Sequence, residues 1–284
     1  MDSDSGGVPS ALRAARIASP ERRVVGREVC CLEQTASTND DAFAALDRDG
    51  EDAHGRAIFA ESQTAGRGRR GRSWLAQPSL GLLFSVALRA PKAPPAASLV
   101  AGAAVAMRDA IRQMSGITVR IKWPNDLYVG PRKLCGILVE ARAGAQRANL
   151  VVGIGINLNQ TEEDFHPDVR AIAGSLRMAS ARSFDREAFA ASALDALDDA
   201  LPAALSADYL RIENEFAEGL DLLGKRVRVT GAQGESSGQL LAFDCVRGLA
   251  IQSESGLLWL PAETTTALQP SEPSADRASG LTKP

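Results

Sequence analysis

Apolar positions recur along this chain with two different spacings, and each spacing predicts a different kind of element. Short apolar runs bounded by polar residues or glycine are typical of buried strands, and alternation with polar residues is typical of a half-buried strand. These patterns predict strands at 24–33, 56–60, 80–88, 117–122, 137–140 and 150–158. Apolar residues spaced three and four apart predict helices at 40–47, 97–114, 185–200 and 206–218. The last two strands are expected to pair as a hairpin.

The two ends of the chain differ from this patterned middle. Residues 1–26 lack a sustained apolar face and residues 270–284 are rich in proline and small polar residues, so both are expected to be flexible. Between 224 and 260, four short strand-like runs at 224–229, 238–242, 248–252 and 257–260 are separated by glycine and serine turns, which predicts a small all-β module of four strands. We therefore expect a larger domain at 27–220 and a smaller one at 221–269.

The segment Glu61–Trp74 has an unusual composition. Its seven consecutive residues 66–72 hold four arginines and three glycines, in a chain whose net charge is -3. Guanidinium groups match phosphate and carboxylate oxygens, and glycines let backbone N–H groups approach a ligand closely. The segment therefore predicts an anion-binding loop that orders around its ligand, because like charges this close repel one another. Arginine-glycine segments also occur as disordered RNA-binding regions, but the predicted core strands on both sides favour a defined site.

The overall charge balance and the cysteines exclude several classes of protein. The chain has 32 basic and 35 acidic residues, so no global charge argues for a nucleic-acid or membrane partner. Its four cysteines fall in no metal or redox spacing, and no long apolar segment or signal peptide is visible, which indicates a reducing cytosol. Neither of the two histidines lies near a carboxylate cluster, so a catalytic triad is not expected.

Polar residues beside the predicted strand and helix ends are further candidates for a site. Ser37 or Thr38 suits the N-cap of the helix that follows, although hydroxyl groups at a helix start can also bind a small polar ligand. Trp123, Asn125 and Asp126 follow a predicted strand, in a proline-containing turn where α/β proteins often bind ligands. Such residues are common in turns, but an aromatic ring beside an amide and a carboxylate could also stack on a base, bind its edge and hold a metal.

Two predicted strands carry candidates at their ends. Lys133 directly precedes the strand at 137–140, where a cation is usually solvated but is also placed to reach a carboxylate. Gly153 and Gly155 lie inside the last strand and allow another backbone or a ligand to come close, and Asn157 lies at the end of that strand. The glycines do not form a dinucleotide-binding fingerprint, because the third glycine and the following helix are missing.

Together these segments resemble the biotin protein ligases, which attach biotin to carrier proteins. The resemblance rests on five motifs in the order and approximate spacing of that family, namely ASTN at 36–39, ESQTAGRGRRGRSW at 61–74, KWPND at 122–126, RKLCGILVE at 132–140 and GIGIN at 153–157. It implies an α+β fold, in which a mixed β-sheet flanked by helices, related to class II aminoacyl-tRNA synthetases, is followed by a small C-terminal β-barrel. It also implies that 27–220 is a biotin- and ATP-binding catalytic domain.

The same resemblance assigns roles to individual residues. The biotin site is expected to contain Ser37, Thr38, Asn39, Gln63, Arg67, Gly68, Arg69 and Lys133. Among these, Arg67, Arg69 and Lys133 are expected to be catalytic, with Lys133 reaching the biotin carboxylate and its acyl phosphate. The nucleotide site is expected to contain Arg70, Arg72, Trp74, Trp123, Asn125 and Asn157. The metal ligands stay unassigned, with Asp126 the one suggestion for Mg²⁺.

The activity implied by the resemblance uses ATP, biotin and Mg²⁺. Biotin and ATP would form biotinyl-AMP, and a lysine of a biotin carboxyl carrier protein would then accept the biotin. Repressor members of the family carry an additional N-terminal DNA-binding domain, for which too few residues precede the first strand here, so DNA binding is not expected. A membrane partner is not expected either, and a homodimer is compatible with the sequence. The alternatives are a lipoate or octanoate ligase on the same scaffold and a nonenzymatic nucleic-acid-binding module.

Overall fold

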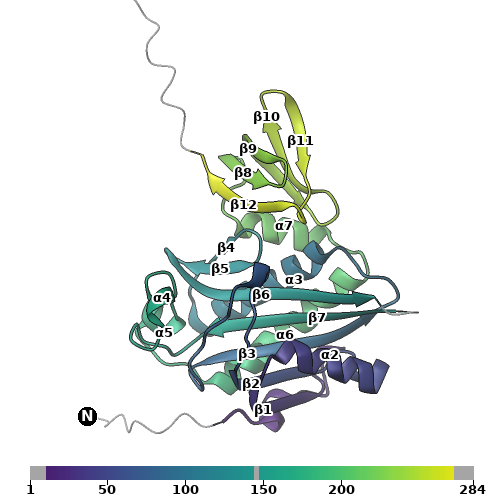
Figure 1. Ribbon diagram of the computed structural model, residues 1–284, viewed down its shortest axis with the longest axis vertical. Helices are drawn as coiled ribbons and strands as arrows, with labels where there is room; N and C mark the ends of the chain where they lie inside the picture. The colour runs from purple at the N-terminus through teal and green to yellow at the C-terminus, as the bar shows by residue number, and fades with distance from the viewer. Residues whose placement is uncertain (1–10, 144–146, 272–284) are drawn as a thin grey trace, which may run out of the picture.

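The computed structural model describes residues 11–143 and 147–271, which form two β-sheets and the helices packed on them (Figure 1). The larger sheet has seven strands in the order β1-β2-β3-β7-β6-β5-β4. These strands are β1 (Val29–Thr35), β2 (Ala57–Gln63), β3 (Gly81–Ala90), β4 (Arg120–Lys122), β5 (Asp126–Val129), β6 (Arg132–Ala143) and β7 (Ala148–Asn157). β1 and β2 pair in parallel and the other neighbours pair antiparallel, so the predicted mixed sheet is confirmed.

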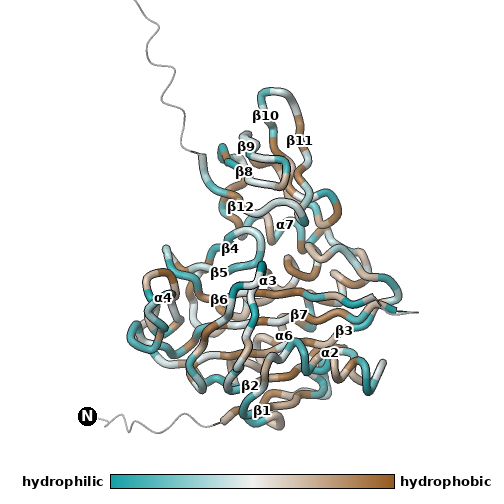
Figure 2. The backbone as a smooth tube through the Cα atoms, viewed as in Figure 1, coloured by the Kyte–Doolittle hydropathy of each residue, from teal (hydrophilic) through white to brown (hydrophobic). Residues whose placement is uncertain are grey.

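The centre of the large sheet is buried on both faces. β3 pairs with β7 along its full length, and β7 forms the predicted hairpin with β6. α2 (Thr38–Asp49) packs on one face, while α3 (Ala96–Ser115) and α6 (Arg186–Leu205) pack on the other (Figure 1). Strands covered on both sides are apolar almost throughout, and Figure 2 shows this apolar character along β3 and β7.

Prediction and structure agree for the long helices and differ for the short ones. The helix predicted at 206–218 begins later, as α7 (Leu210–Gly219), because Ala207 has a left-handed backbone conformation that interrupts it. One-turn helices are too short to show a sequence period; they are α1 (Ala14–Ile17), η1 (Gly50–Ala53), η2 (Arg69–Gly71), α4 (Pro167–Arg170) and α5 (Leu176–Ser180). Within the described ranges, no helix combines the length and apolarity that crossing a membrane requires.

The second sheet is antiparallel and has five strands, one more than predicted. They are β8 (Arg226–Gly231), β9 (Gly234–Asp244), β10 (Gly248–Ser253), β11 (Gly256–Leu260) and β12 (Thr265–Pro270), in the order β11-β10-β9-β8-β12. Within the described residues β11 and β12 are opposite edges, so the expected small barrel is not closed. Pro270 belongs to β12, not to a flexible tail; an edge strand tolerates proline because that position can lack a ladder donor. Residues 272–284 of the predicted tail lie outside the described residues.

An aromatic cluster joins the two sheets. Trp123, in the turn after β4, packs against Phe216 of α7 and Phe243 of β9, with ring centroids 6.1 and 5.8 Å away. Its indole N–H donates to the carbonyl of Thr265 at 3.4 Å, at the start of β12. The smaller sheet is therefore seated on α7 and on the turn of the large sheet. The domain boundary expected at 220/221 stays a prediction.

The expectation of a flexible N-terminal extension is wrong for residues 11–26, which we call the N-terminal strap. Leu12, Ile17 and Val25 of the strap are buried in the main core. Its apolar residues form no sustained face, so no amphipathic period predicts this docking. Residues 1–10 lie outside the described residues.

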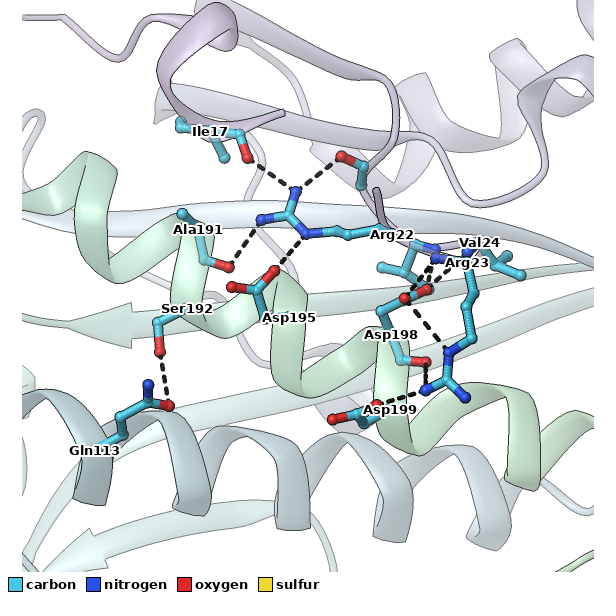
Figure 3. Close-up of polar contacts among 12 residues, drawn as sticks. Ile17, Arg22, Arg23, Val24, Gln113, Ala191, Ser192, Asp195, Asp198 and Asp199 are labelled. Carbon is cyan, nitrogen blue, oxygen red and sulfur yellow. Dashed lines mark hydrogen bonds and ion pairs between the residues drawn. The ribbon is translucent and has the colours of Figure 1, made fainter. Parts of the chain in front are cut away.

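Charged groups fix the N-terminal strap to α6 (Figure 3). The buried Arg22 guanidinium donates to the carboxylate of Asp195 and to the backbone carbonyls of Ile17, Gly26 and Ala191. The carboxylate of Asp198 accepts the backbone N–H groups of Arg23, Val24 and Val25. Burying these charges requires that their hydrogen bonds be made, so the strap is held by specific geometry.

Candidate active site

The arginine loop, residues 66–72, lies between β2 and β3 and has a folded backbone. Gly66 accepts the N–H of Trp74 at 2.9 Å, and Gly68 donates to the carbonyl of Arg72 at 2.6 Å. Arg70 and Gly71 both have left-handed backbone conformations, with φ of 58° and 72°. The loop is therefore a tight turn closed by its own backbone hydrogen bonds, which points its arginines in different directions.

A small cavity of about 50 Å³ lies where the loop meets the large sheet. Its walls come from the start of α2, the end of β2, the first half of β3, the inner residues of β6 and β7, and the Trp74 side chain. Seven of the predicted site residues line it, namely Ser37, Thr38, Asn39, Gln63, Arg67, Trp74 and Asn125. The structure thus brings together most of the residues expected to bind biotin.

The polar residues of the small cavity are hydrogen-bonded to one another. Gln63 Oε1 accepts both the backbone N–H and the hydroxyl of Thr38, at 2.8 and 3.1 Å. The Thr38 hydroxyl lies 2.7 Å from the Ser85 hydroxyl, which donates to Asn39 Oδ1 at 2.6 Å. The Asn39 amide in turn donates to Glu140 Oε2 at 2.6 Å. These bonds fix the orientation of each group before any ligand contact.

Ser37 occupies the N-cap position of α2, but its side chain makes no capping hydrogen bond. Thr38 is the first helical residue and bonds across to β2 and β3 instead. Ser37 therefore has the predicted N-cap position, but neither hydroxyl caps the helix with a hydrogen bond. Ser37 is buried and lines the small cavity.

The glycines of the central strands make room for two side chains. A Cβ on Gly153 would meet the Asn39 amide, and a Cβ on Gly155 would meet the Trp74 indole, each closer than 3.0 Å. Gly136 on β6 also faces Trp74. The predicted close approach is confirmed, although side chains make it, not another backbone. The buried indole nitrogen of Trp74 has no hydrogen-bond partner among the described residues, so it is a donor available to a ligand.

A cationic hollow of about 270 Å³ lies on the other side of the loop, next to β12. Five cationic side chains line it, from Arg69, Arg70, Arg72, Lys122 and Lys133, and Asp126 is the one carboxylate among its described lining residues. Lys133 Nζ lies 2.7 Å from Asp126 Oδ1 and 5.3 Å from the centre of the Trp74 ring. Lys133 therefore stands between this hollow and the small cavity. An excess of positive charge of this kind is a site for a polyanion.

Burial places the arginines of the loop in different electrostatic settings. Burial lowers the pKa of Arg69, and the nearby charge of Arg70 lowers it further. Arg69 makes a long hydrogen bond to Asn125 Oδ1 at 3.4 Å, while the Asn125 amide donates to the backbone of Ile137 at 2.7 Å. Asn125 is thus held by β6 and presents its oxygen to the loop.

Arg67 differs from the other loop arginines. Its guanidinium donates to both oxygens of Asp40, at 2.7 and 2.8 Å, and to Glu140 at 3.1 Å. The hydrogen bond from Arg67 lowers the pKa of Asp40, despite the opposing effect of burial. Both carboxylates escaped the sequence analysis. Glu140 stands at the end of an apolar run, and a lone charge there is the signal that could have identified it.

A third cavity, of about 660 Å³, lies between the loop, the start of α3 and the smaller sheet. Trp123, Phe216, Phe243 and the backbone of the arginine loop are among its walls. Trp123 also lines the cationic hollow, but most of its ring packs in the aromatic cluster. The loop thus borders all three spaces.

Asn157 is the predicted site residue that the structure sets apart. It is buried at the end of β7, where its amide donates to the Gly174 carbonyl and its oxygen accepts from Gln160. It lines none of the three spaces described above. Through Gly174, which also bonds to the backbone of Lys133, its contact with the site is indirect.

The described residues contain no group of three or more histidine, cysteine, aspartate or glutamate side chains that could hold a metal ion. Mg²⁺ often binds through one or two carboxylates together with substrate phosphates. Asp126 in the cationic hollow fits that mode as a single protein ligand.

Comparison with known proteins agrees with this geometry. Residues 31–157 match the model of the Biotin/lipoate A/B protein ligase family. The chain is 37% identical over 168 residues to the bifunctional ligase/repressor BirA of Bacillus spizizenii, covering 57% of this chain and 50% of that protein. It is 36% identical over 153 residues to the biotin--[acetyl-CoA-carboxylase] ligase of Mycobacterium tuberculosis, covering 51% and 55% respectively. The chain thus spans about half the length of the curated relatives it matches.

A solved structure extends the likeness over most of the fold. The biotin protein ligase of Aquifex aeolicus, in complex with biotin and ATP, superposes with a TM-score of 0.70 and 26% sequence identity. The match covers 86% of this chain and 100% of that one. The matched residues 31–157 include the strands that line the small cavity, Lys133 and the arginine loop. This part of the chain is therefore similar to the Biotin/lipoate A/B protein ligase family.

Proposed function

We propose that this protein is an ATP-dependent biotin protein ligase, which makes biotinyl-AMP and transfers the biotin to a lysine of a carrier protein. One observation carries the proposal. A small cavity, whose one charged lining residue Arg67 is paired with carboxylates, suits an uncharged ring system with polar edges. It adjoins a cationic hollow, which suits a polyphosphate. Lys133 and Trp74 stand between them, where a carboxylate of one substrate would meet a phosphate of the other.

The first step forms a mixed anhydride. A carboxylate oxygen of biotin attacks the α-phosphorus of ATP, the bond from that phosphorus to the bridging oxygen breaks, and pyrophosphate leaves. Two anions must be brought together, so the protein contributes charge neutralisation and alignment. Lys133 neutralises the carboxylate and the developing acyl phosphate, while Arg69, Arg70 and Arg72 neutralise the phosphates. Mg²⁺ bound with ATP, with Asp126 as its protein ligand, would supply further neutralisation of the phosphate charge.

The second step transfers the acyl group. The amine of the acceptor lysine attacks the acyl carbon, an amide bond forms, the acyl carbon–oxygen bond breaks, and AMP leaves as the amine loses a proton. No protein nucleophile is needed. The arginine loop borders both sites, and with ligands bound it would exclude water and so protect the anhydride from hydrolysis.

Each remaining residue takes a role from its place. Ser37, Thr38, Asn39 and Gln63 offer oriented donors and acceptors to the ring of biotin. Trp74 covers the small cavity, and Asn125 links the loop to β6. Trp123 and Asn157 support the nucleotide side from the aromatic cluster and from β7.

A direct assay tests this proposal. Purified protein is incubated with Mg²⁺, ATP and radiolabelled pyrophosphate, together with biotin, lipoate or octanoate in separate reactions. Biotin is expected to drive exchange of label into ATP, and a biotin carboxyl carrier domain is expected to become biotinylated. Exchange driven by lipoate or octanoate alone would assign the other branch of the family. Steeply salt-dependent RNA binding without nucleotide turnover would favour the nonenzymatic alternative.

The partner of the proposed enzyme is a carrier domain of a biotin-dependent carboxylase. A homodimer and the lack of a DNA partner stay predictions. Sedimentation with and without biotin and ATP measures the oligomeric state. Titration with labelled duplex DNA measures DNA binding.

A further inference from the structure

Arg67 is the loop arginine whose guanidinium forms ion pairs with carboxylates of the described residues. Its two terminal nitrogens donate to both oxygens of Asp40, and one of them also reaches Glu140. Paired forks of this kind fix the guanidinium plane as well as its position. Among the described residues, Arg70 and Arg72 have no ion-pair partner, and both line the cationic hollow. The loop is therefore divided into an anchored half and a half that faces the polyanion site.

The anchor is connected to the small cavity through Glu140. The same Oε2 atom of Glu140 that accepts from Arg67 also accepts the Asn39 amide at 2.6 Å. From Asn39 the hydrogen bonds continue through Ser85 and Thr38 to Gln63. The Gln63 side chain also lies close to the loop, because a Cβ built on Gly66 would be 3.0 Å from its amide nitrogen.

These hydrogen bonds link the position of the arginine loop to the orientation of the polar side chains in the small cavity. If the Arg67 guanidinium moves away from Glu140, Glu140 loses a charged partner and its carboxylate becomes free to rotate. Asn39 then loses an acceptor of fixed position. If Asn39 turns, its oxygen no longer accepts from Ser85. Hydrogen-bond networks of this kind lose more than one bond when one member is removed.

We propose that Asp40 and Glu140 form a latch for Arg67, and that Arg67 is a positioning residue, not a ligand of the substrate. The latch holds the first half of the arginine loop closed in the free protein and orients Asn39 in the small cavity. Its kinetic consequence rests on the proposed biotin ligase function, whereas its effect on the loop does not.

Trypsin tests the latch without any substrate. Trypsin must take the guanidinium of the cleaved residue into its own pocket, so cleavage after Arg67 requires that Asp40 and Glu140 release it. In the wild-type protein, we expect cleavage after Arg70 or Arg72 to be faster than cleavage after Arg67, as resolved by mass spectrometry. In the double variant Asp40→Asn, Glu140→Gln, we expect cleavage after Arg67 to accelerate by about tenfold.

The control is Asp47→Asn, on the same helix. Asp47 pairs with Arg142 at 3.8 Å and is 61% exposed, so its loss removes an equal charge from α2 without touching the latch. Asp40 and Glu140 are themselves 47% and 34% exposed, so the double variant is expected to fold, which circular dichroism checks. Equal cleavage after Arg67 in the wild type and the double variant would overturn the latch.

Exchange kinetics separate positioning from substrate contact. The variant Arg67→Ala and the double variant are each expected to raise the KM for biotin by about three- to tenfold, with a smaller change in kcat. Combining all three substitutions should add nothing further, because they remove the same anchor. If Arg67 instead contacts the substrate, Arg67→Ala stays harmful in the double-variant background, and the double variant alone is nearly normal. If the wild type shows no biotin-dependent exchange, the proposed function fails, and the trypsin result still decides the latch.

Discussion

The small cavity and the cationic hollow adjoin each other, yet they are organised in opposite ways. Apart from Arg67, which is paired with Asp40 and Glu140, the small cavity is lined by uncharged side chains. Their hydrogen bonds are made within the protein, from Gln63 through Thr38 and Ser85 to Asn39. The cationic hollow collects five positive side chains around one carboxylate. Both are built on the same arginine loop and the same strand, β6.

This difference shows how one loop can serve two unlike ligands. Groups that already have partners keep their orientation, and such a site recognises shape and hydrogen-bond pattern at little cost in reorganisation. Groups that repel one another gain most when a counter-charge arrives, so the hollow attracts a polyanion strongly and tolerates variation in its position. The arginines divide accordingly, because Arg67 is paired within the protein and Arg70 and Arg72 are not.

The largest effect is expected from Lys133→Ala, because Lys133 belongs to both sites. Charge-assisted hydrogen bonds contribute about 1.5–3 kcal/mol each, so biotin-dependent pyrophosphate exchange should fall by about a hundredfold or more. Lys225→Ala is the matched control, since Lys225 pairs with Asp221 in the segment between α7 and β8 and lines neither the small cavity nor the cationic hollow. Normal exchange in Lys133→Ala would show that the two sites do not meet at this residue.

Filling the small cavity is expected to have the next largest effect. In Gly155→Ala the new methyl group would displace the Trp74 indole. The KM for biotin should rise by about ten- to a hundredfold, while the KM for ATP changes less. Gly102→Ala is the control, because its Cβ would meet its neighbours at 3.6 Å, an ordinary contact distance. Equal effects on both substrates would mean that Trp74 serves the two sites alike.

A pair of substitutions sharpens the comparison directly. Thr38→Val removes one hydroxyl from the small cavity and should raise the KM for biotin by about tenfold, with the KM for ATP within about twofold of normal. Arg72→Gln removes one charge from the cationic hollow and should do the reverse. Steady-state exchange with each substrate varied in turn measures both constants. Identical profiles for the two variants would contradict the division into a neutral and a charged site.

Salt is expected to have the smallest effect. Raising the ionic strength from about 0.05 to about 0.5 M shortens the Debye length severalfold and should weaken the attraction of the hollow for ATP by about threefold. The hydrogen bonds of the small cavity are partly buried and should respond less. The ratio of the two KM values across a salt series is the measurement, and a constant ratio would count against the charge-based account of the hollow.

Sequence patterns predicted the parts of this fold that are decided by apolar periodicity. α3 is one example, since it buries one regular face, and the β6–β7 hairpin is another, since its centre is buried on both faces. The N-terminal strap was not predictable in this way, because its docking depends on Arg22 and Asp198, whose partners are more than 160 residues away. Local sequence also does not determine whether the two edge strands of the smaller sheet pair with each other and close it into a barrel.

The site divides along the same line. The family resemblance placed Thr38, Asn39 and Gln63 in the biotin site, and all three line the small cavity together with Trp74, which the resemblance assigned to the nucleotide site. It could not show that Ser85 and Glu140 complete their hydrogen bonds, because each is a single polar residue in an apolar strand and its partner comes close only in the folded chain. It also placed Asn157 in the nucleotide site, although that amide is hydrogen-bonded within the protein.

The aromatic cluster beneath the smaller sheet has a practical consequence for anyone trimming this protein. Ending the chain before β8 would expose Trp123 and Phe216 together and leave a hydrophobic surface prone to self-association. The same cut would delete the wall that β12 gives to the cationic hollow. A shortened version would thus lose solubility and one wall of the space proposed for the polyanion.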